Sequence, residues 1–152
     1  MNKTEFQTGV LSAERMLYRV AKTMLRSDED CADAVQEAIL KAWIALPRLR
    51  EERYFSTWLT RILINECRAV IRRNGRMADM ETLPETAAPE KDDTSLYEAL
   101  SALPEKLRLT VELHYIEGYS VEETARILGV PAGTVKSRLS NGRKLLRKFM
   151  ED

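Results

Sequence analysis

One acidic segment divides the chain and limits the size of any core that it can build. Residues 77–95 contain six Asp or Glu residues, one Lys and two prolines, Pro84 and Pro89. They include few large apolar side chains and show no helical spacing, which favours a flexible linker over a packed element. The segments on either side, residues 1–76 and 96–152, are each near the lower size limit for a stable hydrophobic core. We therefore expect two small modules joined by a flexible acidic linker.

The first module has the apolar spacing of three helices. Apolar residues recur three or four positions apart over residues 5–25, 29–46 and 57–73, and no segment alternates between apolar and polar residues over a useful length. Ser27 is placed to cap the second helix, whose first turn is acidic, as the helix dipole favours. The inner stripe predicted for this second helix consists of Ala32, Val35, Ile39, Ala42, Trp43 and Leu46.

The second module has the spacing of four shorter helices, so the whole chain is predicted to be all-α. Gly118 ends the second of these helices. Ser120 and Glu123 form a capping-box pattern at the start of the third. Gly129 breaks that helix, and Pro131 lies in the first turn of the last one. A helix, a turn of about four residues that contains Gly, and another helix are the signature of a helix-turn-helix.

The last helix is basic although the chain as a whole is neutral. Residues 131–149 contain six Lys or Arg residues and no acidic one, whereas the chain has 24 basic and 24 acidic residues. On a helical wheel an apolar stripe lies opposite short polar side chains and cations, a division that suits a reader of the DNA major groove. The alternative is a solvated basic face that suits the helix dipole. The predicted inner stripe consists of Val135, Leu139, Gly142, Leu146 and Phe149.

Several other classes of protein fit the sequence poorly. No apolar run approaches the roughly 20 residues that cross a bilayer, and no signal-peptide pattern is present, so we expect a cytoplasmic protein without membrane insertion. Cys31, Cys67 and His114 are too few for a Cys/His zinc site, and we expect the thiols to be partly buried. No catalytic constellation or phosphate-binding glycine loop occurs, so we expect neither an enzyme nor a cofactor.

Three motifs resemble, in the same order, those of the extracytoplasmic-function (ECF) sigma factors of bacterial RNA polymerase. "SVEETARILGVPAGTVKSRL" is similar to the family's promoter-reading helix-turn-helix, "DCADAVQEAILKAW" to its clamp-binding helix, and "YFSTWLTRILINECRAVIRR" to its minus-ten segment. The resemblance covers nearly the whole chain. It implies a sigma factor that binds core RNA polymerase, directs it to promoters and promotes strand opening. The implied partners are core polymerase, promoter DNA as duplex and as melted single strand, and an anti-sigma factor.

The resemblance implies two sets of functional residues in the first module, which corresponds to the family's region 2. An apolar and acidic helix face would bind the polymerase, while aromatic side chains and cations would hold an unstacked base and the displaced strand. Plain core positions for Trp43 and Trp58 remain alternatives, as do a solvated Asp33 and Glu37 and a dipole-favoured basic run at residues 68–73. The polymerase set is Asp33, Gln36, Glu37, Leu40 and Trp43, and the minus-ten set is Tyr54, Phe55, Trp58, Arg61, Asn65, Arg68, Arg72 and Arg73.

A third set lies in the second module, which corresponds to the family's region 4 and would read the minus-thirty-five element. Two departures bear on base preference. Asn141-Gly142-Arg143 stands where the family often has Arg-Ala-Arg, and Ala69 stands where relatives often carry Asp. Gly142 costs roughly 1 kcal/mol relative to Ala in a helix, which close helix approach can offset. The implied contacts are Thr134, Lys136, Ser137, Arg138, Ser140 and Asn141, with Arg143 and Lys144 on phosphates.

Two rival functions remain open from the sequence. A conventional helix-turn-helix regulator would bind a two-fold operator as a dimer, with the N-terminal helices forming the dimer surface. The flexible linker argues against this arrangement. The aromatic-plus-arginine segment suits melted DNA better than a duplex operator. The other rival is a helical adaptor whose basic face is incidental.

Overall fold

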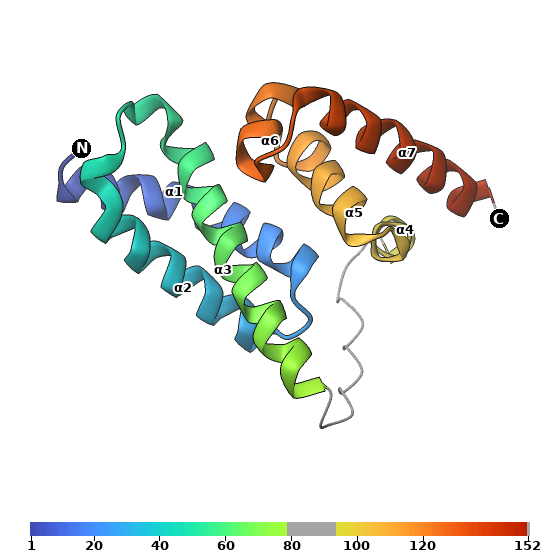
Figure 1. Ribbon diagram of the computed structural model, residues 1–152, viewed down its shortest axis with the longest axis horizontal. Coiled ribbons are helices and arrows are strands. Elements are labelled where there is room, and N and C mark those ends of the chain that lie inside the picture. Colours follow the sequence, from blue (N-terminus) through green and yellow to red (C-terminus); the bar gives the residue numbers. More distant parts are fainter. Residues whose placement is uncertain (79–93, 152) are drawn as a thin grey trace. The chain divides into compact units, whose positions relative to one another are not determined.

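The computed structural model describes residues 1–78 and 94–151, and helices are the only regular elements among them (Figure 1). The predicted all-α class is confirmed. By its internal contacts the chain divides into two compact units, Met1–Pro84 and Glu85–Asp152. The first unit contains α1 (Lys3–Met24), α2 (Asp28–Ala45), the 3-10 turns η1 (Leu46–Arg48) and η2 (Glu52–Tyr54), and α3 (Phe55–Ala78). The second contains α4 (Thr94–Ala102), α5 (Glu105–Val111), the π-helix η3 (Glu112–Ile116), α6 (Val121–Leu128) and α7 (Ala132–Glu151).

The predicted linker differs from the structure at both of its ends. Met77 and Ala78 still belong to α3, and Thr94 and Ser95 already belong to α4. The remaining residues of the predicted linker, 79–93, lie outside the described part of the chain.

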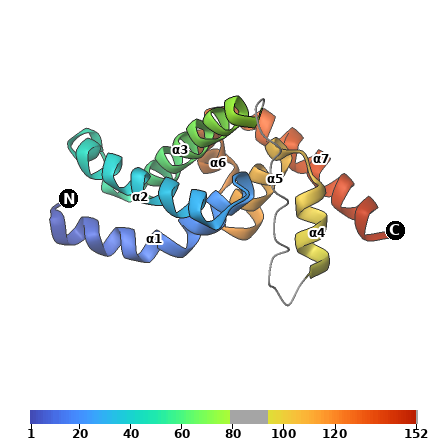
Figure 2. The ribbon, with the colours of Figure 1, turned by 90° about the horizontal axis from the view of Figure 1, so that it is seen from below.

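Side-chain caps fix where the first two helices begin. The Asn2 side chain accepts a hydrogen bond from the backbone of Glu5, and the Glu5 carboxylate accepts one from the backbone of Asn2, which forms a capping box. The predicted Ser27 cap is confirmed, because its hydroxyl accepts a hydrogen bond from the backbone of Asp30. Figures 1 and 2 show that α1 and α3 run in the same general direction and that α2 runs back against them.

The core face of α2 differs from the predicted stripe. Val35 and Ala42 are buried as expected, whereas Trp43 is 43% exposed. The helix packs against both α1 and α3, and small side chains allow both neighbours to approach closely. The larger apolar residues therefore lie at the edge of this interface or outside it. The buried residues of α2 are Cys31, Ala34, Val35, Ala38 and Ala42.

The helix-turn-helix of the second unit forms as predicted. Ser120 and Glu123 make both hydrogen bonds of the capping box at the start of α6. Gly129 ends α6 with φ of 69°, a left-handed conformation that glycine adopts without a steric penalty. The chain then turns directly into α7. The core beneath the motif includes Leu100, Leu103, Val111, Ala125, Val135 and Leu139.

The inner stripe of α7 is shorter than predicted. Val135, Leu139 and Gly142 are buried, and Leu146 packs against the core at its edge. Phe149, however, is 41% exposed. The described core of this unit ends near Leu146 and residues 147–151 are exposed, so the prediction for Phe149 was wrong.

Candidate functional site

The residues predicted to bind polymerase all lie exposed on one face of α2. Asp33, Gln36 or Glu37, Leu40 and Trp43 follow one another at intervals of three or four positions, the spacing that aligns side chains along a helix. Leu40 is 52% exposed and Trp43 is 43% exposed. Two exposed apolar side chains beside two carboxylates can bind a partner that offers an apolar surface and positive charge. We call this set, Asp33, Gln36, Glu37, Leu40 and Trp43, the α2 face.

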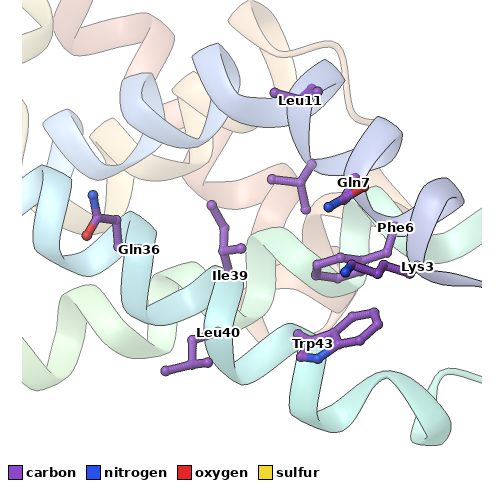
Figure 3. Close-up of a pocket in the computed structure, with 9 residues that line it drawn as sticks. Lys3, Phe6, Gln7, Leu11, Gln36, Ile39, Leu40 and Trp43 are labelled. Atoms are coloured by element: carbon purple, nitrogen blue, oxygen red, sulfur yellow. The ribbon is translucent and has the colours of Figure 1, made fainter.

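An apolar groove between α1 and α2 adjoins the α2 face (Figure 3). Leu40 and Trp43 line it from α2, and Phe6, Val10 and Leu11 line it from α1. The rings of Phe6 and Trp43 have centroids 5.1 Å apart, so Trp43 is held in place although its outer surface is exposed. The contribution of α1 was not predicted from the sequence. The available signal was Leu11, an apolar residue that lies outside the inner stripe of its helix.

The aromatic residues at the start of α3 have different degrees of exposure. Phe55 is buried and packs edge-on against Phe6, with ring centroids 5.8 Å apart. Its ring also lies against Trp58, at 6.1 Å, and both Trp58 and Tyr54 are half-buried. The Arg53 guanidinium lies 4.8 Å from the centroid of the Tyr54 ring. Phe55 is therefore part of the interior of the unit, while Tyr54 and Trp58 keep part of their surface exposed.

Most of the polar residues predicted along α3 form one row. Arg61, Asn65, Arg68 and Arg72, which we call the α3 row, recur at intervals of four, three and four residues and thus share one side of the helix. None of them is buried. Arg73 does not share this side. It is exposed and lies close enough to Lys41 of α2 to oppose the protonation of that residue.

The opposite side of α3 is fixed to α2 by polar contacts. The Lys41 ammonium donates to the Glu66 carboxylate, which is largely buried. This bond raises the pKa of Lys41 above its usual value. The Asn74 amide donates to the Asp30 carboxylate over 3.2 Å. These contacts assign one side of α3 to the interior of the unit and leave the α3 row outside it.

The predicted contacts on α7 are all accessible. Lys136, Ser137 and Asn141 are exposed, and so are the two predicted phosphate-binding cations. Thr134, Arg138 and Ser140 are half-buried at the border with the core. The eight residues therefore surround the buried stripe without belonging to it. They are Thr134, Lys136, Ser137, Arg138, Ser140, Asn141, Arg143 and Lys144.

Gly142 allows a close approach between helices, which can offset its low helix propensity. A Cβ atom at this position would lie 2.9 Å from Cγ2 of Val111, a buried residue of α5. The contact is tighter than side chains normally make. The glycine thus brings α7 against α5 at the centre of the second unit.

Tyr115 holds Arg143 in place, a contact that the sequence does not predict. Arg143 donates a hydrogen bond from Nη1 to the Tyr115 hydroxyl over 2.7 Å. The Tyr115 ring packs edge-on against His114, with centroids 4.9 Å apart. His114 in turn lies with Nδ1 2.7 Å from the Tyr119 carbonyl oxygen. The available signal was a tyrosine three residues before Gly118, the glycine predicted to end its helix.

The described residues offer little for metal or thiol chemistry. No group of three or more His, Cys, Asp or Glu side chains among them is placed to hold a metal ion. Cys31 and Cys67 are both buried. Burial raises the pKa of the Cys31 thiol, so this group stays protonated and unreactive near neutral pH. Within the same residues, no helix is both long and apolar enough to span a membrane.

Comparison with known proteins decides the family. Residues 10–77 match the model of Sigma-70 region 2, and residues 93–146 match that of Sigma-70, region 4. The chain is 34% identical to the ECF RNA polymerase sigma factor SigM of Mycobacterium tuberculosis, over 90% of this chain and 72% of the relative. It is 31% identical to SigW of Bacillus subtilis, over 90% of this chain and 83% of the relative. The chain belongs to the ECF RNA polymerase sigma factors.

A solved structure of a sigma factor supports the same assignment. The sigma factor RpoE, in complex with the anti-sigma factor NepR from Bartonella quintana, aligns with this sigma factor at a TM-score of 0.86 and 26% identity. The alignment covers 97% of each chain. This ECF sigma factor is therefore a transcription initiation factor of RNA polymerase, and the rival assignments to a dimeric repressor and to an adaptor are set aside.

Proposed function

We propose that three surfaces divide the work of this sigma factor. The α2 face binds core polymerase, the start of α3 and the α3 row capture and open the minus-ten element, and α7 reads the minus-thirty-five element. The observation that carries this proposal is the accessibility of each set. Apart from Phe55, every residue involved is exposed or half-buried, while other residues build the cores of the two units.

The minus-ten surface combines two kinds of contact that strand opening needs. An unstacked base requires a flat apolar surface, which Tyr54 and Trp58 can provide, and the Trp58 ring is supported by Phe55. Stacking a base on such a ring contributes roughly 1–3 kcal/mol. The displaced strand requires cations, which the α3 row provides along the same helix. Reading and melting can thus occur on one continuous surface of the first unit.

The division into two units gives the promoter contacts their dependence on polymerase. Each unit offers a limited number of DNA contacts. When both units are held on polymerase, the second contact becomes intramolecular, so the combined affinity exceeds that of either unit. The free protein should therefore bind promoters weakly. Polymerase performs the chemistry, so the chain needs no catalytic residue and works in the cytoplasm with the enzyme.

An anti-sigma factor is a further proposed partner. The aligned RpoE was solved with such a factor bound. The apolar side chains of the α2 face would have to be covered when polymerase is absent, because exposed apolar patches favour association. A protein that covers them would also block polymerase binding.

A pair of variants tests the division of labour. Lys136→Ala with Arg138→Ala removes two cations from α7 and should weaken promoter-specific transcription while leaving core-polymerase binding unchanged. Glu37→Ala with Leu40→Ala should weaken core-polymerase binding, and transcription should fall with it and recover when more of the variant is added. Run-off transcription on a promoter library and a binding titration with core polymerase measure the two effects separately. Loss of polymerase binding in the α7 variant, or normal polymerase binding in the α2 variant, would contradict the proposal.

A further inference from the structure

A second row of cations lies on α1. Arg15, Arg19, Lys22 and Arg26 recur at intervals of four, three and four residues, the same spacing as in the α3 row. We call them the α1 row, although Arg26 lies just beyond the last residue of the helix. All four side chains are exposed. The family motifs that drew attention to α3 do not include this part of the chain.

Contacts between α1 and α3 define how the two rows are related. Gly9 lies against Phe55, and the Met16 sulfur lies 3.6 Å from the Thr60 hydroxyl. The contacts advance along both helices together, so α1 and α3 run in the same direction, as Figures 1 and 2 show. Met16 and Thr60 mark the sides on which the two helices meet.

Helix geometry then places both rows on one face of the first unit. At about 100° per residue, the helical members of the α1 row, Arg15, Arg19 and Lys22, lie roughly 60–120° to one side of Met16, and the α3 row lies roughly 80–140° to the corresponding side of Thr60. For helices that run in the same direction, these rotations lead to the same face. The inward residues Leu17 and Glu66 lie on the other side, where α2 packs. The two rows therefore lie side by side, opposite α2.

This shared face carries almost no compensating charge. From Arg15 to the end of α1 the helix contains no Asp or Glu, and Glu66 is the only acidic residue of α3. Glu66 is bonded to Lys41 on the side of α2. In the α1 row, Lys22 donates to Asp28. No such ion pair involves Arg15 or Arg26 within the described residues, so both guanidinium groups are available to a partner.

We propose that the α1 row binds phosphates of promoter DNA beside the strand held by the α3 row. The inference deepens the proposed function, on which it rests. Packed helices lie about 8–10 Å apart, and cations three or four residues apart repeat every ~5–6 Å. Two such rows form a basic surface wider than one strand requires. The α1 row reads no base, so its contribution is independent of sequence and depends on salt.

The test compares a variant that lacks two cations of the α1 row with a control that lacks two cations elsewhere in the first unit. Arg15→Gln with Arg26→Gln alters the α1 row, and Arg48→Gln with Arg50→Gln removes the same charge from the exposed loop before α3. Each variant is assembled with core polymerase. Its affinity is measured between low and moderate salt for a promoter fork that includes the melted minus-ten strand. Arg61→Gln with Arg72→Gln serves as the positive control for the α3 row.

The expected result is a weaker salt dependence in the α1-row variant, as in the α3-row positive control, and no change in the loop control. If both cations contact phosphates, the slope of log K against log salt falls by about 1.8 for duplex contacts or about 1.4 for single-strand contacts. Repeating the titration with the flanking duplex alone, and with the single strand alone, identifies which DNA supplies the phosphates. The Arg48 and Arg50 control should match the wild type in all titrations.

Three outcomes separate this inference from the proposed function. A slope equal to that of the loop control overturns the inference, and the proposed function stands if the α3-row variant still loses affinity. Weakened polymerase assembly in the α1-row variant also overturns it, because the row would then face the enzyme. If both the α1-row and α3-row variants behave as wild type, the minus-ten assignment itself is wrong.

Discussion

Two glycines in helices of the first unit have opposite surroundings. A Cβ atom on Gly9 of α1 would lie 2.6 Å from the buried Phe55 ring, whereas a Cβ atom on Gly75 of α3 would meet nothing within 4 Å. Phe55 is itself packed between Phe6 and Trp58 and has little room to move. The absence of a side chain therefore permits close packing at Gly9, whereas at Gly75 it makes room for no contact in this structure.

Alanine substitution should distinguish the two positions. We expect Gly75→Ala to stabilise the first unit by up to about 1 kcal/mol, the helix-propensity difference between the two residues. Gly9→Ala gains the same propensity but must displace the Phe55 ring, so we expect net destabilisation. Urea unfolding followed by circular dichroism measures both free energies. A stabilising Gly9→Ala would show that the aromatic cluster at the start of α3 is less rigid than its contacts indicate.

Substitution of Tyr115 tests the position of the Arg143 side chain without changing its charge. Tyr115→Phe keeps the ring against His114 but removes the hydroxyl that accepts the Arg143 hydrogen bond. We expect weaker binding of polymerase holoenzyme to the minus-thirty-five duplex with an unchanged salt slope, because the cation remains. Arg143→Gln should instead lower the slope by about 0.9. Equal slopes in these two variants would mean that Arg143 does not contact a phosphate.

Among the elements, α2 shows best what the sequence can and cannot predict. Its existence, its Ser27 cap and its acidic first turn follow from local chemistry and are confirmed. The face of α2 that is buried cannot be predicted from local chemistry, because apolar residues occur on nearly every side of the helix. Which side is buried depends on two neighbours, and the smallest side chains fit between them. The exposure of Trp43 and Leu40 is thus determined by tertiary packing.

The last helix, α7, shows a similar limit to what the sequence can predict. Ser120, Glu123 and Gly129 specify the helix-turn-helix locally, so these elements are predictable. A helical wheel gives the direction of each side chain but not the length of the core beneath it, which is why Phe149 was misplaced.

The shared face of the α1 and α3 rows is a further feature that the sequence alone does not predict. Each row is visible in the sequence, but their shared face depends on the relative direction of two helices separated by α2.

Packing between α5 and α7 gives a prediction at the level of elements. Gly142→Ala should be neutral or destabilising despite its better helix propensity, because Val111 is buried and its branched side chain is stiff. Val111→Ala removes the methyl group that the new Cβ would meet. We expect a coupling free energy of at least about 0.5 kcal/mol between the two substitutions in a double-mutant cycle. Additive effects in thermal unfolding would contradict the close approach of the two helices.

For the whole molecule, the division into two units predicts that covalent connection matters for function. Each unit has its own buried core, so we expect fragments 1–78 and 94–152 to fold separately, as judged by cooperative unfolding of each. Mixed at the concentration at which the intact chain is active, they should support much less promoter-specific transcription, because the second contact is no longer intramolecular. Full activity of the mixture would show that polymerase holds each unit tightly on its own.

The apolar residues exposed on the surface of the first unit have a consequence for the amount of this protein that a cell can maintain. Leu11, Leu40, Trp43 and Ile44 are all more than two-fifths exposed. Molecules in excess of their binding partners would adhere to one another or to chaperones and become substrates for proteolysis. Overproduction would thus be self-limiting, and the lasting amount of the protein would follow the supply of partners more closely than its own rate of synthesis.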